Sequence, residues 1–164
     1  MTSFMTIDSP IGPLTLLASD GELTGLYMDD QRYAPDAPQT WKSDRSAFGD
    51  AVAQLNAYFA KELQEFDLPL RPSGSPFHLA VWNELTRIPY GQSTSYGDVA
   101  RRVGTPSAYR AVGRANGRNP IAIVIPCHRV IGSNGSLTGY GGGLDRKRWL
   151  LSHESSGVQQ TLAY

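Results

Sequence analysis

The chain has 164 residues and a mass of 17.9 kDa, enough for one ordinary domain or two small ones. Hydrophobic residues make up 40% of it, which excludes an intrinsically disordered chain, and its single cysteine excludes an internal disulfide. No apolar stretch approaches the roughly 18 residues needed to cross a membrane, and the first residues do not resemble a signal peptide. We therefore expect a cytoplasmic protein that does not enter membranes.

The zero net charge hides an uneven distribution. Residues 1–75 carry five basic and eleven acidic side chains, whereas residues 76–164 carry ten basic and four acidic ones. A basic half joined to an acidic half indicates polyanion binding, although an uneven, solvated surface explains the same counts equally well.

The first 75 residues predict a small α+β domain with an antiparallel sheet. Two apolar segments, 14–18 and 23–28, flank Asp20-Gly21, a pattern typical of a β-hairpin. We expect a loop, a helix capped by Ser46 and a further strand to follow, over residues 29–44, 46–59 and 66–70. This half holds no cluster of nucleophile, base and ligands, so we expect it to give structural support.

A stretch rich in Pro, Ser and Gly, residues 71–76, predicts a boundary between domains at 1–75 and 76–164. Beyond it, Ser75 and Ser95 are good N-cap residues, and the apolar spacing becomes helical. We expect helices over about 76–88, 95–103, 105–117 and 145–153. The second and third, joined by a tight turn at Gly104, form a helix-turn-helix pattern, so this half is predicted to be mainly helical and winged-helix-like.

The third of these predicted helices carries a row of arginines. Arg110, Arg114 and Arg118 lie four residues apart and therefore share one face. The residues between them are small: Ala111, Gly113, Ala115 and Gly117. Positive charge on a slim helix suits a phosphate-lined groove, so DNA binding is favoured. The alternative is an exposed basic face whose small residues pack on a neighbour.

Cys127 lies between an apolar run, residues 121–125, and a glycine-rich segment, residues 139–143. A lone cysteine is most often a small buried hydrophobe, but His128 follows directly, and a thiol needs a base to supply thiolate at neutral pH. Neighbouring side chains on an extended backbone point to opposite faces. We therefore expect direct contact between the two only if the chain turns at Cys127, and a bridging water otherwise.

Glu154 is the best candidate for orienting His128, because a carboxylate that accepts from one ring nitrogen fixes the tautomer and raises basicity. His78 and His153 are rival bases. Each lies in a helical pattern and is better explained by surface or packing.

The residues around the cysteine resemble those of the O6-alkylguanine-DNA alkyltransferases, also called methylated-DNA–protein-cysteine methyltransferases. The matching segments are Asn119-Pro120, Pro126-Cys127-His128-Arg129-Val130 and Gly139-Tyr140-Gly141-Gly142-Gly143. The resemblance runs from about residue 76 to residue 154, and the first half resembles that family's small α+β domain. It implies a DNA repair protein that flips an alkylated guanine out of duplex DNA and transfers the alkyl group irreversibly to Cys127. One molecule would repair one lesion.

The resemblance also implies roles for individual residues. Cys127 would accept the alkyl group, His128 would act as base through a water, and Glu154 would orient His128. Tyr96 would assist flipping, Arg110 would fill the gap in the stack, and Asn119 would hold the hinge between recognition helix and active site. Further DNA contacts would come from Ala111, Gly113, Arg114 and Ala115.

The implied substrate pocket comprises Tyr96, the Val130 carbonyl, which would read the exocyclic amine of guanine, Tyr140 and the Gly141 amide. Many family members have a serine in place of Gly141, so a side-chain contribution there is not expected in this protein. No cofactor and no metal are expected, since zinc in some relatives depends on further cysteines.

The expected partner is double-stranded DNA containing O6-alkylguanine, bound by a protein that is monomeric in solution, with cooperative binding on DNA left open. Two other classes compete. A cysteine hydrolase with a Cys-His-Glu triad would turn over repeatedly and would not use the arginine helix. A winged-helix regulator would use that helix and leave Cys127 inert.

Overall fold

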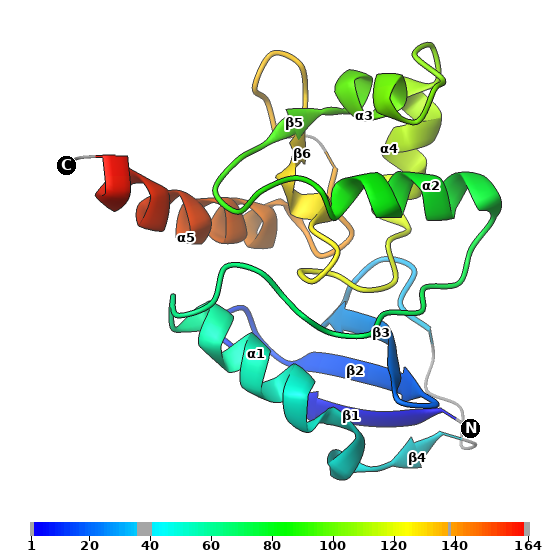
Figure 1. The fold of residues 1–164 in the computed structure, drawn as a ribbon, viewed down its shortest axis with the longest axis vertical. Helices are drawn as coiled ribbons and strands as arrows, with labels where there is room; N and C mark the ends of the chain where they lie inside the picture. Colours follow the sequence, from blue (N-terminus) through cyan, green and yellow to red (C-terminus); the bar gives the residue numbers. More distant parts are fainter. Residues whose placement is uncertain (1, 36–40, 138, 163–164) are drawn as a thin grey trace. The chain divides into compact units, whose positions relative to one another are not determined.

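A computed structural model of the chain describes residues 2–35, 41–137 and 139–162 (Figure 1). It divides into two units, one of Met1–Ser73 with Pro120–Ala122 and one of Gly74–Asn119 with Ile123–Tyr164. The first is built on a sheet and the second is mainly helical, so the predicted α+β fold class is confirmed. No helix in the described part of the chain is long and apolar enough to span a membrane.

The first unit contains a four-stranded sheet in the order β3-β2-β1-β4. An antiparallel meander of β1 (Ser3–Ile7), β2 (Leu14–Ser19) and β3 (Glu22–Met28) is extended by β4 (Lys42–Ser43), which pairs parallel with β1. Asp20 and Gly21 have φ angles of 52° and 80°, as a tight hairpin turn requires. The sequence predicted β2 and β3 but neither β1 nor β4. Part of the segment expected as loop, residues 36–40, lies outside the described residues.

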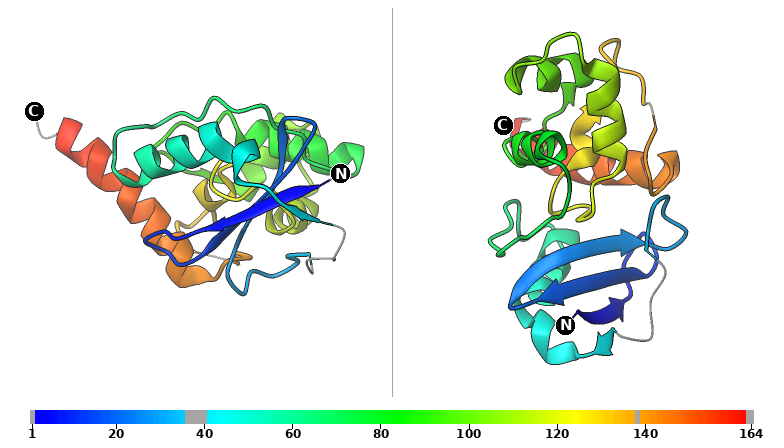
Figure 2. Two further views of the ribbon diagram at one scale, coloured as in Figure 1. Left: turned by 90° about the horizontal axis from the view of Figure 1, so that it is seen from below. Right: turned by 90° about the vertical axis from the view of Figure 1, so that its right-hand side faces the viewer.

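Helix α1 (Gly49–Phe59) covers one face of this sheet (Figure 2) and buries Leu55 and Tyr58 completely. A 3-10 turn, η1 (Arg45–Phe48), precedes it. The prediction that Ser46 caps the helix is wrong. Asp44 has the extended backbone of a cap residue, and its carboxylate accepts from the amide of Ser46 at 3.0 Å.

The outer edge of β3 is covered by two isolated segments. Residues 66–70, predicted as a strand, contribute only the bridge between Leu70 and Leu23. Further along the same edge, Ile121 bridges Leu26. The amide of Leu26 donates to the carbonyl of Pro120 at 2.8 Å, and its carbonyl accepts from the amide of Ala122 at 3.1 Å. The first part of the apolar run before Cys127 therefore belongs to the sheet unit.

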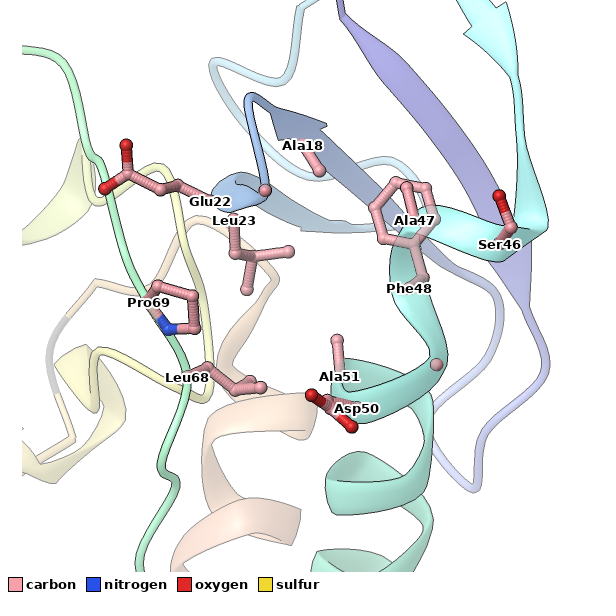
Figure 3. Close-up of a pocket in the computed structure, with 12 residues that line it drawn as sticks. Ala18, Glu22, Leu23, Ser46, Ala47, Phe48, Asp50, Ala51, Leu68 and Pro69 are labelled. Atoms are coloured by element: carbon pink, nitrogen blue, oxygen red, sulfur yellow. The ribbon is translucent and has the colours of Figure 1, made fainter.

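A pocket of about 250 Å³ opens in the first unit between the start of α1, the β2–β3 turn and residues 68–69 (Figure 3). Leu23, Phe48 and Ala51 form apolar parts of its wall, and Glu22 and Asp50 line it with carboxylates. None of the lining residues is a histidine or cysteine, so this pocket holds no nucleophile–base pair.

The second unit contains four helices and a short parallel pair of strands. The helices are α2 (Pro76–Leu85), α3 (Tyr96–Arg102), α4 (Tyr109–Gly117) and α5 (Leu144–Leu162), and the strands are β5 (Thr94–Ser95) and β6 (Val130–Ile131). Ser75 and Ser95 cap α2 and α3 through their hydroxyls, as predicted. Helices α3 and α4, joined through Gly104 at φ 84°, make the predicted helix-turn-helix corner.

Three helix boundaries in this unit differ from the predictions, and the first is the end of α2 at Leu85 instead of residue 88. Helix α4 begins at Tyr109, because residues 105–108 close a separate turn in which the amide of Ala108 donates to the carbonyl of Thr105 at 2.8 Å. Helix α5 extends well past residue 153, so Glu154 lies within it and not at its end. Its residue Leu150 is fully buried, which anchors the helix.

Candidate active site

The chain turns at the cysteine. Cys127–Arg129 form one turn of 3-10 helix, η2, and the amide of Cys127 donates to the carbonyl of Ile125 at 2.8 Å across Pro126. Just upstream, Ile123 has a φ of 73°, an unfavourable value for a β-branched residue. The extended backbone that would send Cys127 and His128 to opposite faces is therefore absent. Both are buried, with the cysteine 5% exposed and the histidine fully enclosed.

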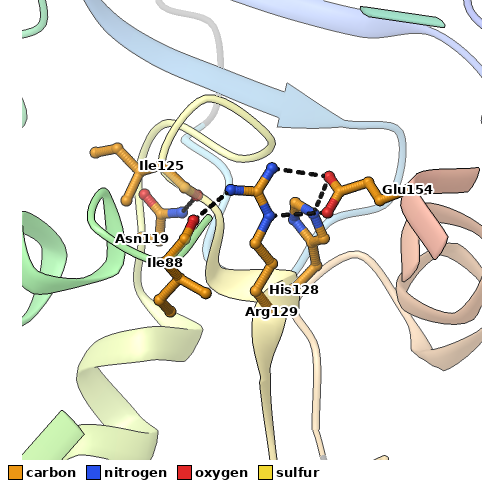
Figure 4. Close-up of polar contacts among 6 residues, drawn as sticks. All are labelled: Ile88, Asn119, Ile125, His128, Arg129 and Glu154. Atoms are coloured by element: carbon orange, nitrogen blue, oxygen red, sulfur yellow. Dashed lines mark hydrogen bonds and ion pairs between the residues drawn. The ribbon is translucent and has the colours of Figure 1, made fainter. Parts of the chain in front are cut away.

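The structure brings His128 and Glu154 together (Figure 4). His128 Nε2 lies 2.7 Å from Glu154 Oε2, and both side chains are buried. An ionised carboxylate only accepts, so Nε2 carries the shared hydrogen and Nδ1 is left as an acceptor. Within the described part of the chain Nδ1 has no hydrogen-bond partner. The histidine can therefore act as a base through Nδ1, which is buried and carries neither a hydrogen nor a hydrogen bond.

Arg129 holds the same carboxylate, a contact that the sequence analysis missed. Its Nε donates to Glu154 Oε1 at 2.8 Å and its Nη2 to Oε2 at 3.0 Å, while Nη1 donates to the carbonyl of Ile88 at 2.7 Å (Figure 4). No local pattern in the sequence indicates this contact, because it joins residues 25 positions apart.

Burial and charge set the protonation states of this group. Burial raises the pKa of Glu154, but hydrogen bonds from His128 and Arg129 and the charge of Arg129 outweigh it and hold that pKa well below its usual range. Burial lowers the pKa of His128. Glu154 raises it, whereas Arg129 and Lys147 lower it further. Burial also raises the pKa of the Cys127 thiol. The resting group is therefore a thiol, a neutral imidazole and a carboxylate.

Lys147 is a second residue that the sequence analysis missed. It is completely buried, its Nζ donates to the Val130 carbonyl at 2.7 Å and to the Gly139 carbonyl at 3.5 Å, and it lies 5.9 Å from the ring centre of Tyr96. Burial lowers its pKa from 10.5 to about 8, partly opposed by the charge of Cys127. This lysine joins three of the predicted pocket segments.

Two asparagines tie helix α4 to the cysteine segment. Asn119 Nδ2 donates to the Ile125 carbonyl at 2.7 Å (Figure 4), and Asn116 Nδ2 donates to the Cys127 carbonyl at 3.3 Å. Both side chains are buried. Asn119, predicted as a hinge, therefore links the end of the helix to the turn before the thiol, and the thiol also receives a hydrogen bond from it.

The arginine row lies at the surface as the helical spacing indicates. Arg110, Arg114 and Arg118 are all exposed, although Arg118 is the C-cap residue of α4 and not part of its interior. The guanidinium of Arg110 lies over the ring of Tyr109, 5.8 Å from its centre, and that ring is itself 50% exposed.

The small residues of α4 do not all face solvent. The prediction that Ala115 contacts DNA is wrong for this conformation, because its side chain is fully buried and its carbonyl accepts from Trp82 Nε1 at 2.8 Å. A Cβ added to Gly113 would lie 3.8 Å from the ring of Tyr96, so this glycine faces α3. Ala111 is half-buried.

The remaining predicted pocket residues lie in the same unit. Val130 begins β6 and is buried, whereas Tyr96, Tyr140 and Gly141 are half-buried. The glycine-rich segment, residues 139–143, lies within the described residues, and residue 138 before it lies outside them. His78 and His153 stack on Trp82 and Trp149 with ring centres 5.3 and 4.8 Å apart, as packing residues do. In the described ranges no three His, Cys, Asp or Glu side chains form a group that could hold a metal ion.

A buried thiol beside a histidine–glutamate pair, carried by a helix-turn-helix unit with an exposed arginine face, defines a DNA-binding protein with a nucleophilic cysteine. Comparisons with known proteins agree. Residues 76–156 match the family model of the 6-O-methylguanine DNA methyltransferase DNA binding domain, and residues 3–72 match that of the ribonuclease-like domain.

Relatives cover nearly the whole chain. A methylated-DNA–protein-cysteine methyltransferase of Mycobacterium tuberculosis is 56% identical over 156 residues, 95% of this chain and 94% of that protein. One of Methanosarcina acetivorans is 47% identical over 153 residues, 93% of this chain and 98% of that protein. The structure of M. tuberculosis OGT in complex with DNA is similar with a TM-score of 0.91 at 56% identity, covering 94% of each chain.

The chain belongs to the methylated-DNA–protein-cysteine methyltransferase family. The family predicted from the sequence is thus confirmed, and the second unit is the family's DNA-binding domain.

Proposed function

We propose that this protein repairs O6-alkylguanine in double-stranded DNA by transferring the alkyl group to Sγ of Cys127. The observation that carries the proposal is the position of Cys127 on the turn whose next residue, His128, contacts the ionised Glu154 at 2.7 Å. That arrangement supplies a nucleophile and an oriented base within one buried group.

The reaction begins with the proton of the thiol. His128 Nδ1 takes it through a bridging water, and Glu154 stabilises the imidazolium that forms. The Cys127 sulfur then attacks the carbon bonded to guanine O6; the sulfur–carbon bond forms, the carbon–oxygen bond breaks, and its electron pair stays on the guanine. Protonation of that anion restores guanine. The carbon–sulfur bond of the resulting thioether is stable, so the thiol is not regenerated and each molecule acts once.

Delivery of the base is assigned to helix α4 and its neighbours. A guanine inside a duplex is out of reach, and extruding it costs a few kcal/mol. Exposed Arg110 is the residue that fills the vacated space, with Arg114 in contact with phosphates and Ala111 and Gly113 allowing close approach. Asn119 connects this helix to the turn at Cys127.

The flipped base is received by Tyr96, Tyr140, the Gly141 amide and the Val130 carbonyl. Lys147 already donates to that carbonyl, but a carbonyl oxygen has two lone pairs and can also accept from the exocyclic amine. The sequence-based expectations that the protein is cytoplasmic and monomeric in solution stay predictions, as does the identity of the alkyl group.

The test is a mass measurement. The protein is mixed with a duplex carrying O6-methylguanine, weighed intact and digested to map the modified peptide. We expect one methyl group per molecule, on Cys127, and none on Cys127→Ser, which should still bind DNA. Repeated turnover would instead support the cysteine hydrolase, and DNA binding without any adduct would support the regulator.

A further inference from the structure

Arg129 has no part in the reaction described above, yet it makes more polar contacts with Glu154 than His128 does. We propose that Arg129 is a positioning residue that balances the charge of Glu154 and fixes its carboxylate, and thereby keeps His128 uncharged and available as a base. This inference rests on the proposed function and names a further residue on which that site depends.

The contact between the two side chains is a two-point clamp. Nε reaches Oε1 at 2.8 Å and Nη2 reaches Oε2 at 3.0 Å, so the planar guanidinium and the carboxylate lie edge to edge (Figure 4). Arg129 is 6% exposed and Glu154 is 1% exposed. Because water hardly reaches either group, each depends on the other to balance its charge.

The guanidinium is itself fixed. Its Nη1 donates to the carbonyl of Ile88 at 2.7 Å, beyond the end of α2, and its Cζ lies 5.8 Å from the ring centre of Tyr90. Arg129 therefore holds Glu154 of α5 against the segment that follows α2. A carboxylate fixed in this way presents Oε2 to His128 Nε2 at one position only.

One carboxylate oxygen couples the two partners. Glu154 Oε2 accepts from both Arg129 Nη2 and His128 Nε2. If the arginine were absent, the buried carboxylate would still contact His128, and protonation of that ring would balance its charge. A histidine that has taken up a proton to balance Glu154 cannot accept the proton of a thiol.

The charged and titratable groups around His128 favour this reading. Glu154 and Lys147 of α5 and Arg129 of η2 act on its charge, and Tyr90 borders Arg129 and Glu154. Burial lowers the pKa of His128, Glu154 raises it, and Arg129 and Lys147 lower it further. Removing Arg129 therefore leaves the raising influence of Glu154 in place and takes away one of the lowering ones.

A purely structural clamp is the competing explanation, and pH profiles separate the two. The test measures alkylation of Cys127 by iodoacetamide as a function of pH, which needs no DNA, together with the titration of the His128 ring by NMR. In Arg129→Met we expect the acid limb of the alkylation profile and the His128 titration to move together to higher pH by about one unit, a tenfold loss of rate on that limb. Arg129→Lys, which keeps the charge, should recover most of the shift.

The decisive variant pair removes the carboxylate. In a Glu154→Gln background, Arg129→Met should move both profiles by much less, because the arginine acts chiefly by balancing the charge of Glu154. The matched control is Arg148→Met on α5. Arg148 pairs with Asp145 at the surface, where an ion pair contributes far less than the buried pair of Arg129 and Glu154. The profile of this control should coincide with that of the unchanged protein. If Arg129→Met does not fold, Arg129→Gln replaces it with the same expectation.

Two results would overturn the inference: a folded Arg129→Met protein with unshifted profiles, or a shift of the same size in the Glu154→Gln background. Failure of the proposed function would look different. In that case the alkylation profiles would shift as expected while a duplex with O6-methylguanine left Cys127 unmodified.

Discussion

Replacing Lys147 by methionine should change how the stability of the protein depends on pH. The folded state holds this lysine completely buried, with a pKa lowered from 10.5 to about 8. Between these two values the unfolded chain binds a proton that the folded chain does not, so the free energy of unfolding rises with pH across the window. A difference of about 2.5 units corresponds to about 3 kcal/mol.

Other groups titrate in the same range in the opposite sense. Burial raises the pKa of Cys127, Tyr27 and Tyr90, so these groups make the folded state less stable as pH rises above their ordinary pKa values. The quantity to measure is therefore the effect of Lys147→Met in a Cys127→Ser background, in which the tyrosine contributions cancel and Cys127, whose pKa depends on Lys147, does not titrate.

Urea denaturation, followed by circular dichroism and tryptophan fluorescence from neutral pH to pH 10.5, gives that difference. Near neutral pH the two proteins should be similar, because the variant escapes the cost of a buried charge but leaves the Val130 carbonyl without its donor, a loss of about 1–3 kcal/mol. At pH 10.5 the free energy of unfolding of the protein that keeps Lys147 should have risen by about 3 kcal/mol relative to that of the variant. A constant difference, like that expected for the exposed Lys42→Met control, would refute the reasoning.

Three further predictions concern Glu154, Arg110 and Asn119. Glu154→Gln should lower stability by about 3–5 kcal/mol at neutral pH by leaving Arg129 unpaired. Since the pKa of Glu154 is depressed, the difference should begin to shrink as pH falls below about 4.5 and should be lost only as pH falls through the much lower pKa of the folded state; a difference that stays constant in acid would contradict this. Arg110→Ala should slow repair of duplex DNA at least tenfold more than reaction with free O6-benzylguanine, as expected for loss of a flipping residue, and equal losses would remove that role. Asn119→Ala should cost about 1–3 kcal/mol in urea denaturation by orphaning the Ile125 carbonyl, so an unchanged midpoint would argue against the link.

Much of the fold can be predicted from short-range patterns in the sequence. Asp20-Gly21 marks a hairpin, Ser75 and Ser95 cap helices through hydroxyls that accept from amides three residues on, and these elements lie where the sequence predicted them. Ser46 failed as a cap because Asp44, two residues earlier, offered a stronger acceptor in the right backbone conformation.

The same distinction between short-range patterns and long-range contacts applies to the candidate site. The nucleophile, its neighbouring histidine and the exposed arginines can be found from residue type and spacing. By contrast, nothing local in the sequence shows that Lys147 is buried under the Val130 carbonyl, that Arg129 clamps the same carboxylate as His128, or that Ala115 faces the core.

The sequence by itself determined the family, the α+β fold class and the lone thiol with its histidine, because each depends on residues close together in the chain. Which side chains surround that thiol and its histidine depends on the tertiary structure. The 3-10 turn at Cys127 replaces the extended backbone, and it directs His128 and Arg129 to Glu154, some 25 residues away. A pairing over that separation is chosen by which charges become buried together, and burial exists only once the helices have packed.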